Sequence, residues 1–160
     1  DISLCVTSAD CIPLMLFDPL RCAICAIHAG WKGILNGIID KSISAMIKEL
    51  QSDPGNIIVG IGPSIGICCY EVGEDLAILF SKRFGDSILK RTRTRWMLDL
   101  RKTVQLALMD NGILKGNIEG IELCTSCRSD LFHSYRRDGK GCGKQISFIS
   151  LIGNRLLFDR

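Results

Sequence analysis

The chain has 160 residues, of which 47% are hydrophobic and 23% are charged. This composition is typical of one globular domain with a substantial core, and it excludes a disordered or collagen-like chain. The 20 basic and 17 acidic side chains leave a formal charge of +3, which gives no reason to expect nucleic acid or an anionic membrane as a partner. Apolar runs such as residues 12–17 are too short to cross a bilayer.

Cysteine usage points to a reducing compartment. The chain has nine cysteines, an odd number, and its core is large enough to need no disulfides. No segment reads as a secretory signal, so we expect a cytoplasmic, reduced protein. The sequence opens on Asp1 and enters an apolar segment at once, like a strand already under way. We therefore expect residues 1–160 to be a single domain that lacks its N-terminal part.

The first half of the chain predicts strands followed by a long helix. Residues 4–7, 12–17 and 22–28 predict three strands, which we expect to be neighbours in one sheet. Residues 32–50 carry apolar side chains at spacings of three and four, and so predict one amphipathic helix. Residues 57–61 predict a short buried strand.

The second half alternates helices and strands. Residues 72–84 predict a second helix, and Asp99 can cap a third that ends near Asn111 and Gly112. Residues 118–124 and 146–152 predict two further strands. No repeat or linker divides the chain, so the sequence predicts one mixed α/β domain.

Cys11 and His28 are the first candidates for chemistry. His28 ends a predicted strand just before a glycine-flanked turn into a helix, a place where α/β sheets often bind ligands. Cys11 lies on the loop before the second strand. If the two strands are neighbours, both side chains should meet at the carboxyl ends of the strands, on one edge of the sheet.

Three interpretations of this pair remain open. A thiolate and an imidazole are good zinc ligands, and a zinc with an open position would be catalytic. Without a metal, the same pair could be a thiolate–imidazolium nucleophile. The ordinary alternative is a small buried cysteine and a strand-end histidine bonded to the backbone.

The other cysteines are interpreted as packing residues. Two CxxC pairs, at residues 22–25 and 124–127, could in principle form a four-cysteine zinc site. In an extended strand, however, Cys22 and Cys25 point to opposite faces, and the pair has no glycine that would help it turn. Residues 68–69 are interpreted as packing in a tight turn.

Two polar segments could bind substrate. Residues 62–66, which include Ser64, expose backbone amides after a strand and could cradle a phosphate or sugar, although a plain turn is the alternative. Residues 132–139 bring together a hydroxyl, the ring of Tyr135 and two guanidinium groups. Arginine suits phosphate and Tyr135 could stack on a base, with a solvated loop as the alternative.

Five segments together resemble one known family. Residues 7–13, TSADCIP, resemble its TADCxP motif, and residues 28–33, HAGWKG, match its HAGWRG motif except for the lysine. Residues 62–72, GPSIGICCYEV, resemble its GPsIgpccYeV segment, and residues 124–125 and 134–137 resemble its CT and SYRR segments. The family is the one labelled multicopper polyphenol oxidase or laccase-like, now associated with purine nucleoside phosphorylase and adenosine deaminase activity.

The resemblance implies a fold and a metal site. The implied fold is a mixed-sheet α/β sandwich, similar to the cysteine-hydrolase-like fold of a bacterial cytotoxic deamidase. The implied metal is zinc, held by one cysteine and two histidines. By motif match, Cys11 and His28 are metal ligands and catalytic residues, and the first histidine belongs to a segment before the TADC motif, where this chain has no residue. His133 stands where the family usually has phenylalanine and is not assigned as that ligand.

The resemblance also implies an activity. The expected reaction is phosphorolysis of purine nucleosides (adenosine, inosine and methylthioadenosine), together with adenosine deamination, in a zinc-dependent cytoplasmic enzyme. The implied substrate-binding residues are Lys32, Ser64, Tyr135 and Arg136, of which Lys32 and Arg136 would hold phosphate and Tyr135 would contact the base. The expected partners are purine nucleosides and phosphate, with no nucleic acid and no membrane.

Two alternatives compete with this function. The first is a copper-dependent polyphenol oxidase, which the older label suggests. It is less favoured because type-one copper needs two histidines with a cysteine, and multicopper sites need more histidines than the two in this chain. The second is a non-catalytic or partner-binding member, because the first metal histidine is absent.

Overall fold

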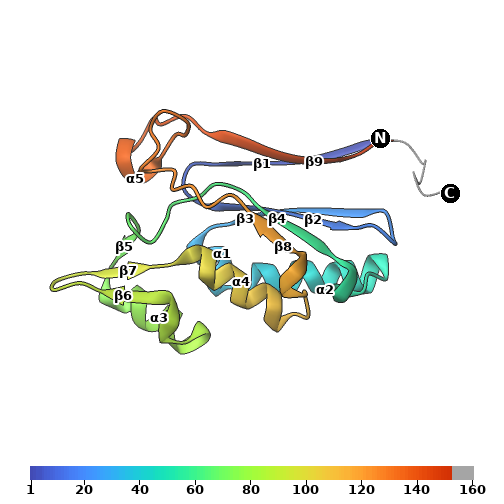
Figure 1. Ribbon diagram of the computed structural model, residues 1–160, viewed down its shortest axis with the longest axis horizontal. Coiled ribbons are helices and arrows are strands. Elements are labelled where there is room, and N and C mark those ends of the chain that lie inside the picture. Colours follow the sequence, from blue (N-terminus) through green and yellow to red (C-terminus); the bar gives the residue numbers. More distant parts are fainter. Residues whose placement is uncertain (153–160) are drawn as a thin grey trace.

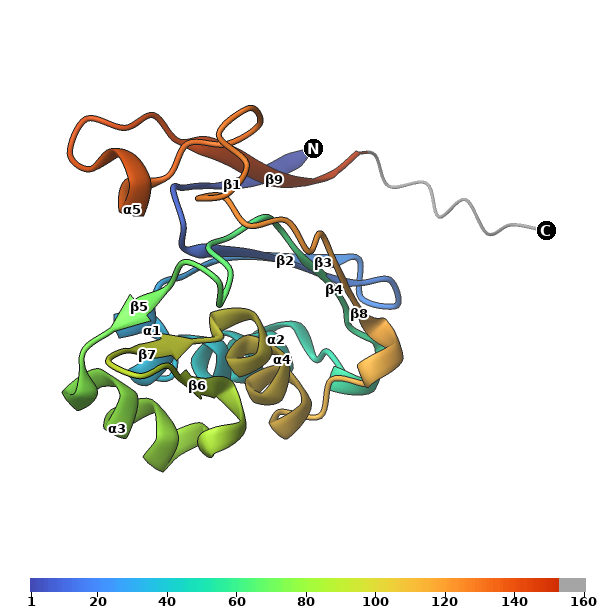
Figure 2. The ribbon, with the colours of Figure 1, turned by 60° about the vertical axis from the view of Figure 1, so that its left-hand side comes forward.

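The computed structural model describes residues 1–152, which stack in three layers (Figures 1 and 2). A two-stranded ribbon of β1 (Ile2–Ser8) and β9 (Gln145–Leu151) lies over one face of a four-stranded sheet. Helices α2 (Ile38–Leu50) and α4 (Leu100–Asp110) cover the opposite face. The predicted mixed α/β sandwich is confirmed.

The central sheet contains parallel and antiparallel pairs. Its strand order is β3-β2-β4-β8, with β2 antiparallel to β3 and β4, and β4 parallel to β8. The bounds are β2 (Ile12–Asp18), β3 (Ala23–Ala29), β4 (Ile58–Ile61) and β8 (Ile118–Gly120). The strands predicted at residues 12–17, 22–28 and 57–61 are therefore confirmed to within one residue at each end.

The strand predicted over residues 118–124 ends at Gly120. Beyond it, only the bridge between Ser64 and Cys124 continues the pairing among the described residues. The physical reason is Arg101, whose guanidinium donates to the carbonyls of Gly62 and Ile121. A side chain thus uses carbonyl groups that a longer strand pair would need.

The expectation that β1 joins β2 and β3 in one sheet is wrong. β1 pairs along its whole length with β9, from Ile2 opposite Leu151 to Ser8 opposite Gln145, and the ribbon packs over β3. The chain leaves this layer at Asp10, which has a positive φ of 88°. Periodicity predicts that a segment is a strand, but it carries no information on the strand that pairs with it.

The helix predicted over residues 32–50 is two helices. α1 (Trp31–Leu35) is capped by Asn36, and α2 begins at Ile38 after Gly37, which has a φ of +75°. A glycine adopts this left-handed conformation readily, so the chain can change direction there. The apolar face of α2 still packs on the sheet through Ile39, Ile43 and Met46.

The segment predicted as a helix over residues 72–84 begins later than expected. Its first position, Val72, belongs to β5 (Glu71–Val72), and α3 (Glu74–Phe84) starts after Gly73. β5 pairs with β7 (Trp96–Leu98), which also pairs with β6 (Leu89–Arg91). This small sheet was not predicted, because its strands are only two or three residues long.

The predicted cap of α4 is confirmed. Asp99 Oδ1 accepts a hydrogen bond from the backbone N–H of Lys102 at 2.9 Å, and Gly112 follows the helix with a φ of +86°. A short helix, α5 (Tyr135–Asp138), completes the fold near the end of the β1–β9 ribbon (Figure 1). Three 3₁₀ helices lie at Pro54–Asn56, Asp86–Ile88 and Lys115–Asn117. None of the helices in residues 1–152 is long and apolar enough to span a membrane.

Candidate active site

Cys11 and His28 lie at one edge of the central sheet. Cys11 directly precedes β2, and the antiparallel register places Pro13 opposite His28 in β3. The Cys11 sulfur and His28 Nε2 lie 3.1 Å and 3.7 Å from the position that a Cβ atom on Gly30 would occupy. The structure thus brings these two predicted residues together. Only His28 is at a carboxyl end, however, since Cys11 stands before the amino end of its strand.

The His28 ring is held in one orientation. Its Nδ1 lies 2.9 Å from the backbone carbonyl oxygen of Thr7. A carbonyl can only accept a hydrogen bond, so Nδ1 carries the proton and donates it. In the neutral ring, Nε2 then has the lone pair, and it lies beside Cys11. This is the arrangement by which proteins prepare a histidine to bind a metal ion.

The Cys11 thiol is half-buried next to a carboxylate. Burial, and secondly the negative charge of Asp10, raise the pKa of Cys11 above its usual value. These surroundings disfavour a free thiolate, so they argue against a metal-free thiolate–imidazolium nucleophile. A cation beside the sulfur would reverse the effect, because it stabilises the ionised form.

Asp10 connects four segments of the chain. Its side chain is 8% exposed, and its two carboxylate oxygens accept from Thr125 Oγ1 at 2.6 Å and from the Arg136 backbone N–H at 2.7 Å. Its carbonyl accepts from the backbone N–H of Ile65 at 3.0 Å. Asp10 was not among the residues predicted from the sequence. Its position next to Cys11 in the TSADCIP segment was the signal that could have revealed it.

Arg136 is fixed by backbone carbonyls and by an aromatic ring. Its guanidinium donates to the carbonyl of Cys69 at 3.3 Å and to that of Glu71 at 2.9 Å, and lies 5.2 Å from the centre of the Tyr70 ring. Burial and the proximity of Cys11 raise the pKa of Tyr70 to about 12, although Arg136 opposes the shift. Tyr70 therefore remains a neutral donor beside Cys11. Sequence analysis missed it, although it is part of the GPSIGICCYEV segment.

The other predicted substrate residues have different surroundings. Lys32 lies in α1, with its Nζ 5.3 Å from the centre of the Trp31 ring. Ser64 is only 2% exposed and forms the bridge with Cys124. Tyr135 opens α5 and is 55% exposed. Lys32 and Tyr135 are thus exposed to solvent, whereas Ser64 is buried.

His133 lies apart from this arrangement. Its ring packs beside Gly143, and its backbone exchanges hydrogen bonds of 3.2 Å with the side chain of Gln145. The structure gives it the role of a packing residue between α5 and β9.

Four other cysteines form a cluster that the sequence did not predict. The sulfur atoms of Cys68, Cys69, Cys124 and Cys127 all lie within 4.8 Å of one another, so the cluster could bind a metal ion. The interpretation as packing residues is wrong for Cys68 and Cys127, which are exposed, whereas the half-buried Cys69 and Cys124 do pack against the hydrophobic core. Burial opposes ionisation of Cys124, but the backbone N–H groups of Gly66, Cys127 and Ser126 outweigh it and lower its pKa to about 7.

Comparison with known proteins identifies the family. Residues 1–152 match the family described as multi-copper polyphenol oxidoreductase laccase. The chain belongs to this family. It is 38% identical over 154 residues to purine nucleoside phosphorylase LACC1 of Mus musculus, covering 94% of this chain and 36% of that protein. It is 34% identical over 152 residues to a purine nucleoside phosphorylase of Bacteroides thetaiotaomicron, covering 92% of this chain and 56% of the relative.

Solved structures of relatives have the same fold. The crystal structure of the hypothetical protein YfiH from Bacillus licheniformis superimposes with a TM-score of 0.88 at 35% identity, covering 94% of this chain and 58% of that one. The crystal structure of YlmD from Geobacillus stearothermophilus gives a TM-score of 0.86 at 30% identity, over 92% and 56% of the two chains. The chain thus spans little more than half the length of these two structures.

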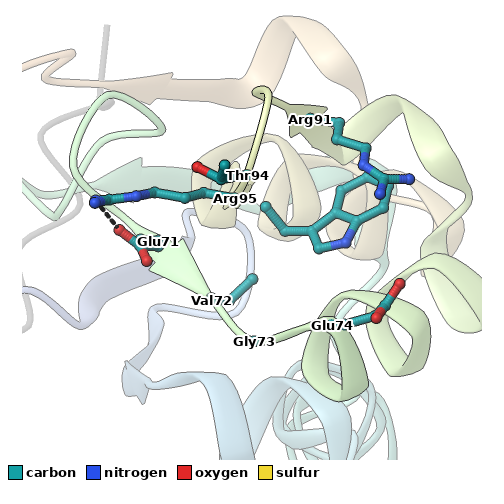
Figure 3. Close-up of a pocket in the computed structure, with 8 residues that line it drawn as sticks. Glu71, Val72, Gly73, Glu74, Arg91, Thr94 and Arg95 are labelled. Carbon is teal, nitrogen blue, oxygen red and sulfur yellow. Dashed lines mark hydrogen bonds and ion pairs between the residues drawn. The ribbon is translucent and has the colours of Figure 1, made fainter.

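A cavity of about 280 Å³ lies beside Glu71, the residue whose carbonyl binds Arg136. It lies between β5 and the β6–β7 hairpin, where Arg95 Nη1 binds Glu71 Oε2 at 2.6 Å and the Arg91 guanidinium lies 5.0 Å from the centre of the Trp96 ring (Figure 3). Glu71 connects the two places, because its carbonyl accepts from Arg136 while its carboxylate faces the cavity.

Proposed function

We propose that this chain carries the catalytic centre of a zinc-dependent purine nucleoside phosphorylase, with Cys11 and His28 as metal ligands. One observation carries the proposal. The Cys11 sulfur and the lone-pair nitrogen of His28 converge beside Gly30, while the Thr7 carbonyl fixes the other ring nitrogen. Relatives at 30–38% identity that are named purine nucleoside phosphorylases support the choice of reaction.

The residues present fit zinc. A thiolate and an imidazole are both ligands that zinc prefers, and Gly30 leaves open the space that a side chain would fill. Catalytic zinc sites usually have three protein ligands. Cys11 and His28 supply two, and we propose that a histidine outside this chain supplies the third. Bound there, zinc would act as a Lewis acid on a substrate oxygen.

Arg136 is proposed to bind the attacking phosphate. In phosphorolysis, a phosphate oxygen forms a bond to C1′ of the ribose while the bond from C1′ to the purine nitrogen breaks. An arginine has five N–H donors, so Arg136 can bind phosphate while it keeps its bonds to the carbonyls of Cys69 and Glu71. Lys32 and Ser64 are proposed to assist at the phosphate and the sugar. Tyr135 is proposed to contact the base, together with Tyr70 as a neutral donor.

The proposal includes adenosine deamination as a second activity of the same centre, with adenosine, inosine and methylthioadenosine as nucleosides for cleavage. The nine free cysteines suit a reducing compartment, so we propose a cytoplasmic protein. The copper oxidase alternative is less favoured. His28 is one of only two histidines in the chain, and the other, His133, packs beside Gly143.

The test is an assay of the complete protein that contains this chain. Purine base released from inosine should require phosphate, and it should be lost in Cys11→Ala and in His28→Ala while both variants keep their circular dichroism spectra. Cys5→Ala is the matched control, because Cys5 is an exposed cysteine of β1. Full activity in Cys11→Ala, or base release that does not depend on phosphate, would contradict the proposal.

A further inference from the structure

Two loops that are distant in sequence bring four thiols together. Cys68 and Cys69 lie in the turn after Gly66. Cys124 forms the bridge to Ser64, and Cys127 lies in the turn that follows it. We propose that these four cysteines bind one zinc ion as a closed structural site, separate from Cys11 and His28. This inference does not depend on the proposed function.

The spacing of the sulfur atoms fits a single ion. In a tetrahedral site with Zn–S distances of about 2.3 Å, neighbouring sulfur atoms are about 3.8 Å apart. The sulfur of Cys127 lies 3.3 Å from that of Cys69 and 3.6 Å from that of Cys68, and no pair in the cluster is more than 4.8 Å apart. Four sulfur ligands in a tetrahedron are typical of zinc among the divalent metals.

The backbone around the cluster is arranged as in thiolate sites. The N–H of Gly66 donates to the Cys124 sulfur at 3.2 Å, and such a bond favours the deprotonated ligand that zinc requires. A Cβ on Gly66 would lie 3.2 Å from both the Cys68 sulfur and the Cys124 Cβ. Glycine at this position therefore lets the two loops approach closely enough for all four sulfur atoms to meet.

Burial does not explain the two exposed members of the cluster. Cys68 and Cys127 are exposed, and Cys69 and Cys124 are half-buried. Exposed cysteines gain little from packing, and thiols left this close together on a surface are open to oxidation. A metal ion would make use of all four side chains and protect them.

The same two loops are already joined by α5. Arg136 binds the carbonyls of Cys69 and Glu71 in one loop, and Arg137 binds those of Thr125 and Ser126 in the other, at 3.0 Å and 3.1 Å. The zinc ion would fix directly the separation that α5 sets through these hydrogen bonds. The role of the zinc ion is therefore to hold the two loops at a fixed separation.

The first test is metal analysis of the full chain in a Cys11→Ala background, which removes the other candidate site. We expect about one zinc ion per chain, and less than about a tenth of that after Cys124→Ser or Cys127→Ser is added. Cys22→Ser is the matched control, because Cys22 is an exposed cysteine outside the cluster. Absence of metal in the Cys11→Ala chain, iron in place of zinc, or zinc that persists in Cys124→Ser would each overturn the proposal.

The second test needs no substitution in the cluster, so it does not depend on the folding of such a variant. A mercurial reagent titrated into the Cys11→Ala chain should release zinc in step with the modification of four thiols. Cobalt in place of zinc should give the intense sulfur-to-metal absorption of a four-thiolate site. A disulfide within the cluster, detected by mass in protein prepared under reducing conditions, would overturn the proposal.

Discussion

Two proposed zinc sites, one at Cys11 and His28 and one in the four-cysteine cluster, differ in the number of ligands that this chain supplies. At the sheet edge, Cys11 and His28 converge beside Gly30, and the zinc site proposed there takes only two ligands from this chain. In the four-cysteine cluster, two turns provide a complete set. Zinc sites with open positions are catalytic, and closed sites are structural. The local backbone decides the difference, since two strand ends offer few side chains to one point, whereas two facing turns offer four.

Hydrogen bonds connect the two proposed sites. Thr125 lies between Cys124 and Cys127 in the sequence and donates to Asp10, the neighbour of Cys11. Arg136 binds both Asp10 and the carbonyl of Cys69. Substitutions at each place, and at the connection between them, should therefore separate their contributions.

The largest effect is expected from Cys11→Ala. Loss of a metal ligand should lower the rate of nucleoside cleavage by about a thousandfold or more, because no neighbour can replace it in the transition state. The zinc content of the four-cysteine cluster should not change. Steady-state kinetics and metal analysis of the same preparation check both statements. Equal loss of zinc from the cluster would show that the two places are one cooperative site.

Asp10→Ala tests the connection. It would leave Thr125 Oγ1 and the Arg136 N–H without their buried acceptor, so we expect a loss of about 3 kcal/mol in the free energy of unfolding. Urea unfolding measures it. Asp53→Ala is the control, because Asp53 accepts one exposed backbone bond from Gly55 and should cost about 1 kcal/mol or less. Equal losses in the two variants would remove the basis for treating Asp10 as the connection.

Gly30→Ala tests the open space at the first place. The new Cβ would lie 3.1 Å from the Cys11 sulfur, so zinc affinity and activity should fall by about tenfold to thirtyfold. Gly73→Ala is closely matched, since each glycine precedes a helix with a negative φ, of −82° and −69°, and a Cβ on Gly73 meets no atom within 4 Å. Unchanged zinc affinity in Gly30→Ala would mean that the metal does not lie there.

Arg136→Lys should have the smallest effect. An ammonium group cannot span the carbonyls of Cys69 and Glu71 as the planar guanidinium does, so the KM for phosphate should rise about tenfold. Arg128→Lys, at an exposed ion pair with Asp130, should leave the KM for phosphate unchanged. A fall in kcat without a change in KM would instead place Arg136 at the reacting bond.

The sequence correctly predicted the helices and strands that are determined by residues close together in the chain. The strands around residues 12–17 and 22–28 and the Asp99 cap follow from side-chain periodicity and hydrogen-bond chemistry over a few residues. The break at Gly37 was missed, because the apolar spacing continues through it and only the backbone conformation reveals it. The pairing of β1 with β9 was missed because strand partners are set by the whole fold.

For the same reason, one of the two proposed metal sites could be predicted from the sequence and the other could not. Cys11 and His28 could be proposed together because they flank neighbouring strands of one hairpin. The cluster could not, because residues 68–69 and 124–127 meet only through the parallel contact between Ser64 and Cys124. Tyr70 was missed because its significance depends on the position of Arg136 above its ring.

The pairing of β1 with β9 also governs the order of events during synthesis on the ribosome. Thr7, whose carbonyl orients His28, stands opposite Ile146, so the ribbon that holds Thr7 closes only after residue 146 has emerged. Contacts between such distant positions form late, because the intervening loop must be ordered first. The β2–β3 hairpin can therefore form as soon as residue 29 has emerged, whereas the ribbon that holds the Thr7 carbonyl beside the His28 ring must wait for β9.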